Sequence, residues 1–131
     1  MKLTLADTIF STYIRTRAGW NCQRCGKHYE PPTKALHCAH YHSRGHWATR
    51  YHADNAISLC YGCHRYIDGH QAVKDELFEE ILGKERFSQL LMMKQLTIKD
   101  MKHTKKSIQK WARAEYRQKI QELVSCESGG F

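Results

Sequence analysis

The chain lacks any long hydrophobic run. Of its 131 residues 41% are hydrophobic, but no apolar stretch approaches the roughly 20 residues that a membrane span needs. The segment 1–7 also lacks the apolar core of a signal peptide. These absences argue against a membrane protein and predict a cytoplasmic one, whose thiols stay reduced. Six cysteines in such a protein indicate metal binding rather than disulfides.

Acidic residues are also scarce. Asp and Glu number 13 against 21 Lys and Arg, which gives a formal net charge of +8. Such an excess indicates a polyanionic partner, nucleic acid before an anionic membrane surface; the alternative is a basic surface that serves solubility alone. Acids gather within residues 75–85 and bases within 94–119. We therefore expect nucleic acid at residues 36–65 and at the C-terminal helix, and not between them.

The hydrophobic pattern predicts a mixed α+β protein without internal repeats. The expected elements are a helix over 5–17, a strand over 35–42, a polar loop through 54, a short strand over 57–60 and a helix from residue 62 or 63. Thr4 and Asp7 resemble a capping box at the first helix. From about His70 the pattern is helical to the end, with a stop at Gly83.

Thr97 and Asp100 are expected to cap a further, C-terminal helix. The chain then divides into three parts. Residues 1–70 form an N-terminal helix and a zinc-bound module, residues 71–125 a helical extension that packs on it, and residues 126–131 a flexible tail.

The cysteines carry the strongest metal signal. Cys22/Cys25 and Cys60/Cys63 are two Cys-x-x-Cys pairs separated by 34 residues, and four thiolates so arranged suit one tetrahedral structural Zn²⁺. The alternatives are an iron–sulfur centre or independent thiols. The long interval predicts further structure between the two pairs. Cys38 and Cys126 lie outside the pattern and are expected to be packing or incidental thiols.

The interval itself resembles a known motif. Residues 54–64, Asp-Asn-Ala-Ile-Ser-Leu-Cys-Tyr-Gly-Cys-His, are similar to the second half of the HNH endonuclease motif, and His40 precedes them where such motifs place their first histidine. Within that superfamily, Ala-His-Tyr-His-Ser-Arg-Gly at 39–45 resembles the phage NinG (Rap) recombination nucleases. So does the order of elements, from a basic helix into Cys-x-x-Cys-Gly at 22–26. The likeness covers roughly residues 14–124, although His64 stands where NinG proteins are expected to carry Asn.

This resemblance implies a small ββα-metal (HNH) module that hydrolyses DNA phosphodiesters with a divalent metal. It further implies branched recombination intermediates, a D-loop or Holliday junction, and a phage-encoded protein acting in the host cytoplasm. The catalytic metal would be Mg²⁺ or Mn²⁺, with Ni²⁺ and Zn²⁺ as alternatives. Two nicks across a junction would suit a homodimer.

Site roles follow from the same resemblance. His40 is the expected general base, because a neutral imidazole accepts a proton near pH 7. Asn55 is expected to fix the loop between the strands through its side-chain amide, so that it aims His40; an ordinary Asp54-Asn55 turn is the alternative. His64 is the first choice for a ligand of the catalytic metal.

The chain departs from the HNH pattern at Ala39, where many of these enzymes carry a metal ligand. His37 shares a strand face with Ala39 and is expected to supply that ligand, with His42 as the second choice. Asp68 lies one helical turn after His64 and is expected to be a second ligand or to hold the first; an ordinary surface acid is the alternative.

Basic and aromatic side chains define the expected DNA contacts. Arg44, Arg50 and Arg65 would bind phosphates near the cut. Trp47 and Tyr51 would stack on a distorted base, or else pin their loop to the core. On the C-terminal helix, a stripe of basic residues at three- and four-residue steps would follow the DNA backbone: Lys99, Lys102, Lys106, Lys110, Arg113 and Arg117. A merely solvated helix face is the alternative.

Two other functions remain open. The absence of a ligand at Ala39 favours a non-catalytic zinc-containing module that binds nucleic acid. An RNA-processing nuclease on the same scaffold is the third possibility.

Overall fold

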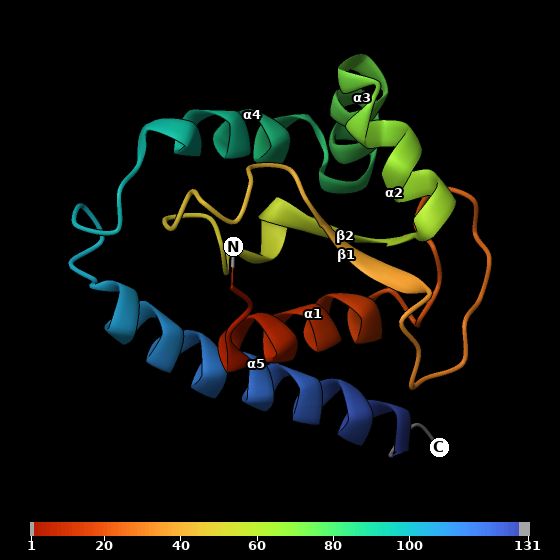
Figure 1. Ribbon diagram of the computed structural model, residues 1–131. Coiled ribbons are helices and arrows are strands. Elements are labelled where there is room, and N and C mark those ends of the chain that lie inside the picture. Colours follow the sequence, from red (N-terminus) through yellow and green to blue (C-terminus); the bar gives the residue numbers. More distant parts are fainter. Residues whose placement is uncertain (1, 129–131) are drawn as a thin grey trace.

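A computed structural model describes residues 2–128, and within them five α-helices surround a two-stranded sheet, as expected for an α+β protein (Figure 1). In chain order the elements are α1 (Leu5–Arg17), β1 (Leu36–His40), the 3₁₀ turn η1 (Ala53–Asn55), β2 (Ala56–Cys60), α2 (Tyr61–Asp68), α3 (Gln71–Leu82), α4 (Lys84–Met92), the 3₁₀ turn η2 (Met93–Gln95) and α5 (Lys105–Ser128). None of these helices combines the length and apolar character needed to cross a membrane.

The two strands are antiparallel, in a register that runs from Leu36 opposite Cys60 to His40 opposite Ala56. Both strands were predicted at these places, although β1 is three residues shorter than expected and β2 begins one residue earlier. Helix α2 follows β2 without a connecting loop, so Cys60 is both the last residue of the strand and the N-cap of the helix.

The sheet separates two hydrophobic clusters. On one side Ile57 and Leu59 pack with α2, α3 and α4. On the other side Cys38 and Ala56 pack with α1 and α5. Figure 1 shows α1 lying between the sheet and α5, and the rings of Phe10 in α1 and Tyr116 in α5 meet edge to face at 4.9 Å. The predicted helical extension therefore packs on both sides of the strands.

Helix α1 has the predicted bounds and the predicted capping box. The side chain of Thr4 accepts a hydrogen bond from the backbone of Asp7, and the Asp7 carboxylate accepts one from the backbone of Thr4. Two of the orphan N–H groups at the helix start are satisfied in this way.

The prediction for the last helix is wrong at its start. Thr97 and Asp100 do exchange the two capping hydrogen bonds, at 3.0 and 3.2 Å, but only a turn follows. Lys102 adopts a left-handed conformation (φ +60°) that a helix does not continue through. A second pair, Thr104 and Ser107, exchanges the same bonds and starts α5.

The predicted flexible tail, 126–131, overlaps the end of α5. Helix α5 continues to Ser128, so the first three of those residues are helical. Residues 129–131 lie outside the described part of the chain.

Candidate metal centre and histidine groove

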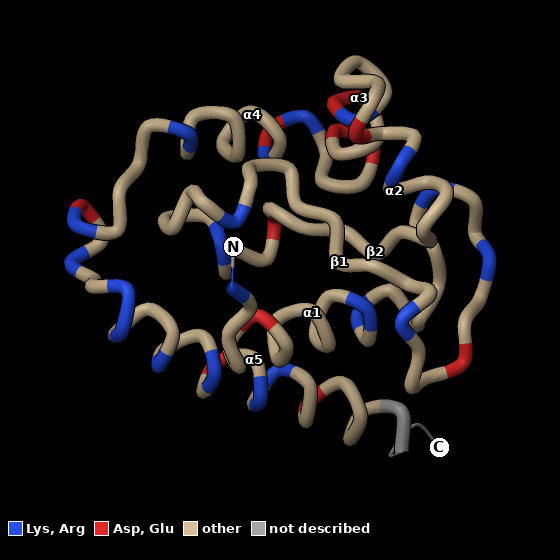
Figure 2. Tube along the Cα trace, in the orientation of Figure 1, with Lys and Arg blue, Asp and Glu red and all other residues tan. Residues whose placement is uncertain are grey.

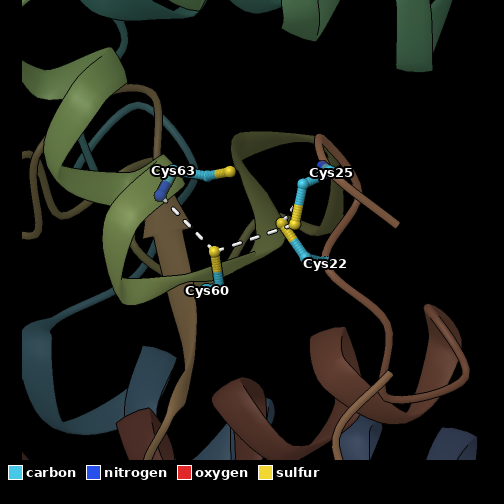
Figure 3. Close-up of side chains that lie close together, drawn as sticks. All are labelled: Cys22, Cys25, Cys60 and Cys63. Carbon is cyan, nitrogen blue, oxygen red and sulfur yellow. Dashed lines mark hydrogen bonds between the residues drawn. The ribbon is translucent and has the colours of Figure 1, made fainter. Parts of the chain in front are cut away.

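Four cysteines converge as their spacing predicts. Figure 3 shows Cys22 and Cys25 on the segment after α1, facing Cys60 and Cys63 at the junction of β2 and α2. All four sulfur atoms lie within 4.8 Å of one another, and the Sγ atoms of Cys25 and Cys60 are 3.9 Å apart. Four thiolates at about 2.3 Å from a tetrahedral Zn²⁺ are about 3.8 Å apart, so this cluster could hold zinc.

The groups around the cluster stabilise negative charge on Cys22, whereas burial and the neighbouring thiols raise the pKa of Cys63 to about 12. The backbone N–H groups of Cys25 and Cys63 donate to the Sγ atoms of Cys22 and Cys60, both at 3.5 Å. Burial opposes ionisation of Cys22, but hydrogen bonds from the backbone, that of Cys25 first, outweigh it and lower its pKa to about 6. Arg24 adds a charged donor, with its Nη1 3.6 Å from the Sγ of Cys63. These donors offset the charge of a thiolate cluster.

His40 stands at the end of β1 with one ring nitrogen engaged. Its Nε2 lies 3.2 Å from the carbonyl oxygen of Arg50, and because a carbonyl only accepts, Nε2 carries the proton. Nδ1 therefore carries the lone pair. Burial, and then the positive charge of Arg44, lower the pKa of His40 to about 4. The ring is therefore neutral at physiological pH, and a pKa this low also makes it a weak base.

Asn55 makes the amide contacts that the sequence predicts. The residue is fully buried. Its Oδ1 accepts from the backbone N–H of His42 at 2.8 Å, and its Nδ2 donates to the carbonyls of His42 and Thr49 at 3.0 and 3.1 Å. The side chain thus ties the chain just after His40 to the far end of the loop. Its contribution to the chemistry stays a prediction.

Two adjoining depressions run along β1, and we call them together the β1 groove. One, of about 280 Å³, is lined by Cys38, His40, Ser43, Arg44, Gly45 and His64. The other, of about 310 Å³, shares Cys38, His40 and Arg44 and continues along α1 to Arg15 and Lys34. The structure therefore brings His40, Arg44 and His64 around one depression. Burial raises the pKa of the Cys38 thiol to about 12, which suits the expected packing role.

His37 lies beside His64, which lines the groove. Their Nδ1 atoms are 3.0 Å apart. The Asp68 carboxylate lies 3.5 Å from Nε2 of His64, on the far side of that ring from His37. Within residues 2–128 the four cysteines are the only group of three or more side chains that meets the geometric criteria for a metal site. His37, His64 and Asp68 thus lie together, but two imidazoles rather than three ligands face a common point.

Of the expected DNA contacts, that of Arg50 is wrong, and Tyr51 follows the alternative of a residue that pins its loop to the core. Arg50 is 1% exposed and forms a 2.6 Å ion pair with Asp7, which is also buried. A buried carboxylate needs a charged partner, so Arg50 neutralises Asp7 instead of a phosphate. Tyr51 is equally buried and cannot stack on a base. Trp47 is half-buried, with the Arg50 guanidinium 4.2 Å from its ring centre, so it does help to pin the loop.

The other predicted contacts remain at the surface. Arg44 lines the β1 groove, and Arg65 is exposed and donates to the Tyr61 hydroxyl at 2.8 Å. On α5 the buried positions are Ile108, Ala112 and Tyr116. Four of the basic residues lie on the opposite face of that helix: Lys106, Lys110, Arg113 and Arg117.

Lys99 and Lys102 precede α5 and do not belong to this stripe, which corrects the prediction. Figure 2 shows the bases along α5 and the acids on α3, the separation that the sequence indicates.

Several structural contacts had no clear sequence signal. His42, the second choice for the missing ligand, instead donates from Nε2 to the Leu90 carbonyl at 2.7 Å. His46 donates to the Lys94 carbonyl at 2.6 Å. These bonds fix the loop after β1 to the last turn of α4 and to η2, respectively. The contact of Arg24 with the Cys63 sulfur had only a weak sequence signal, the position of a basic residue inside a Cys-x-x-Cys pair.

Comparison of the chain with protein-family models, curated proteins and solved structures gives no match.

Proposed function

We propose that the chain is a metal-dependent HNH-type endonuclease that hydrolyses DNA phosphodiesters, with Zn²⁺ held by Cys22, Cys25, Cys60 and Cys63 as its structural metal. The observation that supports this most is the state of His40. It is a neutral histidine with its Nε2 proton given to a backbone carbonyl, and it lines a basic depression together with Arg44 and His64.

In the proposed reaction His40 is the general base. Its Nδ1 takes a proton from water as the water oxygen attacks phosphorus, and the bond from phosphorus to the leaving sugar oxygen breaks. Arg44 binds a non-bridging phosphate oxygen and offsets the growing negative charge. Asn55 is a positioning residue, because it holds the backbone on both sides of the loop that carries these groups.

His37 and His64 are the proposed ligands of the catalytic metal. Two ligand nitrogens at about 2.1 Å from one ion and at right angles are about 3.0 Å apart, which matches the 3.0 Å between their Nδ1 atoms. Asp68 favours the proton on Nε2 of His64, so its Nδ1 carries the lone pair, which accepts from Nδ1 of His37 here and could coordinate a metal. Imidazole ligands favour Mn²⁺, Ni²⁺ or Zn²⁺ over Mg²⁺. The metal would stabilise the charge of the leaving oxygen.

The proposed substrate is branched DNA, a D-loop or a Holliday junction. This part depends on the resemblance of residues 39–45 and of the element order to NinG nucleases. The basic lining of the β1 groove, which includes Arg15, Lys34 and Arg44, suits a nucleic-acid backbone but does not select a branch.

The test is cleavage of labelled linear and branched DNA with Mg²⁺, Mn²⁺ or Ni²⁺. We expect the wild type to cut branched DNA and His40→Ala to be about 10²- to 10⁴-fold slower. His28→Ala is the matched control, because His28 is exposed and pairs only with Asn21 and Glu30. Absence of cutting by the wild type with every metal would contradict the proposal.

One observation favours a second function, a zinc-containing module that binds nucleic acid without cutting it. Only the four cysteines form a full metal cluster within residues 2–128. Elemental analysis after dialysis against Mn²⁺ discriminates between the two. If the protein contains zinc alone, the binding module is supported. If it contains zinc and manganese, and His64→Ala loses the manganese, the nuclease is supported. An RNA substrate would show as competition by single-stranded RNA against branched DNA.

A further inference from the structure

A second cavity adjoins the catalytic depression, and we call it the Trp47 pocket. It has a volume of about 410 Å³ and is formed by residues 45–48, residues 94–98 and Lys105. Its size falls within the range of about 300–1,000 Å³ typical of small-molecule sites. Gly45 lines both this pocket and the depression that holds His40 and His64, so the two hollows share a wall.

The walls of the pocket are aromatic and aliphatic, and its charged residues are cations. Trp47 supplies an indole, and Leu96 and Ile98 supply apolar surface. Lys94 and Lys105 are its charged lining residues, and none of the described residues that line it is acidic. A ligand with an uncharged flat ring and negative groups on either side fits this combination. The ring would stack on Trp47, and the negative groups would form ion pairs with the lysines.

The loop that forms the pocket is held in place. His46 is fixed from both ring nitrogens, by the Thr49 hydroxyl at 3.0 Å and by the Lys94 carbonyl at 2.6 Å. Trp47 rests on the buried guanidinium of Arg50, 4.2 Å from its ring centre. The exposed Lys105 lies 5.3 Å from the same ring and can exchange that contact for a phosphate. A preformed site of this kind loses little entropy on binding.

We propose that the Trp47 pocket receives one unpaired nucleobase of the DNA, next to the phosphate in the β1 groove, while Lys94 and Lys105 contact the flanking phosphates. This proposal depends on the nucleic-acid binding proposed above, but not on cleavage. It gives a physical reason for a preference for branched DNA with a single-stranded part, such as a flap or D-loop. A base there is already unpaired, whereas a duplex must lose pairing and stacking before a base can enter.

The test is a double-mutant cycle in which the protein and the DNA are each changed at one position and the dissociation constant is measured. Divalent metal is not added, so that no strand is cut. The proteins are the wild type, Trp47→Leu and Trp47→Phe. The DNA is a labelled flap or four-way junction, either intact or with one abasic site placed in turn at each position near the branch.

We expect Trp47→Leu to weaken binding of the intact junction at least about fivefold, and Trp47→Phe by less than about twofold, because stacking needs an aromatic ring. We expect one abasic position to weaken wild-type binding by a similar factor and to have no further effect on Trp47→Leu. Circular-dichroism melting checks that both variants fold, and Trp111→Leu, on α5 outside the pocket, is the matched control.

Additive losses, or an unchanged affinity of Trp47→Leu, would overturn the base pocket. So would failure of the wild type to bind DNA. If Trp47→Leu and Trp47→Phe lose the same binding affinity, and this holds at every abasic position, then the tryptophan only supports the loop and does not stack on a base. Cleavage is scored separately, with His40→Ala. A protein that shows the abasic cycle but never cuts DNA contradicts the nuclease and leaves the pocket intact.

Discussion

The cysteine cluster and the β1 groove use similar ligand chemistry in opposite ways. The cluster brings four soft donors within 4.8 Å, and backbone N–H groups and Arg24 stabilise its sulfur atoms. The protein itself supplies all four ligands of a tetrahedral metal ion. Beside the groove the Nδ1 atoms of His37 and His64 are 3.0 Å apart, and no third side chain of residues 2–128 completes a metal cluster with them. A closed site serves the fold, whereas an open one has room for water and substrate.

The largest expected effect separates the two sites most clearly. Cys22→Ser should lose zinc and leave the chain largely unfolded. Structural zinc contributes about 10–16 kcal/mol in zinc-finger peptides, which is comparable with the whole stability of a domain, about 5–15 kcal/mol. Circular dichroism and elemental analysis measure both effects.

Cys126→Ser is the matched control, because that thiol is exposed on α5 and lies outside the cluster. A Cys22→Ser protein that folds and melts like the wild type would show that the cluster carries no structural metal.

The second prediction concerns acid stability. The folded-state pKa of His40 is about 4, below the ordinary value of 6.5. As the pH falls from 6.5 towards 4, the unfolded chain binds a proton that the folded chain does not, so the free energy of unfolding falls. His40→Gln removes this dependence. Between pH 7 and pH 5 the wild type should lose roughly 2 kcal/mol more than the variant does.

Urea unfolding at the two pH values measures this difference, and it is independent of cleavage. The comparison with His40→Gln cancels the other groups that titrate in this range, such as His42, His52 and His64, whose pKa values burial also lowers. Parallel curves for the two proteins would contradict a buried, neutral His40.

A smaller effect is expected at the groove. Asp68→Asn keeps the size of the side chain but removes the charge that favours the proton on Nε2 of His64. We expect about tenfold weaker Mn²⁺ binding, near the lower end of the range for such outer partners, because Asp68 is exposed. Zinc content should not change. Titration calorimetry with Mn²⁺ measures the effect, and loss of zinc instead would mean that the two sites are not independent.

The smallest effect is expected on α5. Replacing Lys106, Lys110 and Arg113 with Gln should leave folding and both metals intact, and should weaken DNA binding almost equally for all sequences. Each lost phosphate contact should lower the salt slope of log K by about 0.9. The measurement is affinity against salt concentration. The exposed acids Glu79 and Glu80 on α3, changed to Gln, are the control and should not lower that slope.

Much of this arrangement could be predicted because it depends on short-range patterns. Cys-x-x-Cys spacing fixes each half of the cluster, and the Thr4–Asp7 pair marks the start of α1. The strand alternation placed His37 on the face of Ala39, and His37 does lie beside His64. The hydrogen bonds of Asn55 agree with the loop-fixing contacts expected from the HNH resemblance.

The failures at Arg50 and His42 depend on distant partners, whereas the one at the start of α5 is local. Arg50 has the appearance of a loop arginine free to bind phosphate, but Asp7, 43 residues earlier, pairs with it in the core. Thr97 and Asp100 form the local bonds of a helix start, and the helix begins only after the left-handed turn at Lys102. His42 meets a carbonyl 48 residues away. Sequence patterns do not report which segments come together in space.

Helix α2 has a consequence for the order of assembly. It spans only eight residues, and a helix so short is unstable in water on its own. Cys60 caps it and Cys63 lies in its first turn, directly before His64. His64 therefore has a fixed position only once the thiolates are held together. A chain synthesised without zinc would contain every proposed nuclease residue and yet have no place for a second metal to bind.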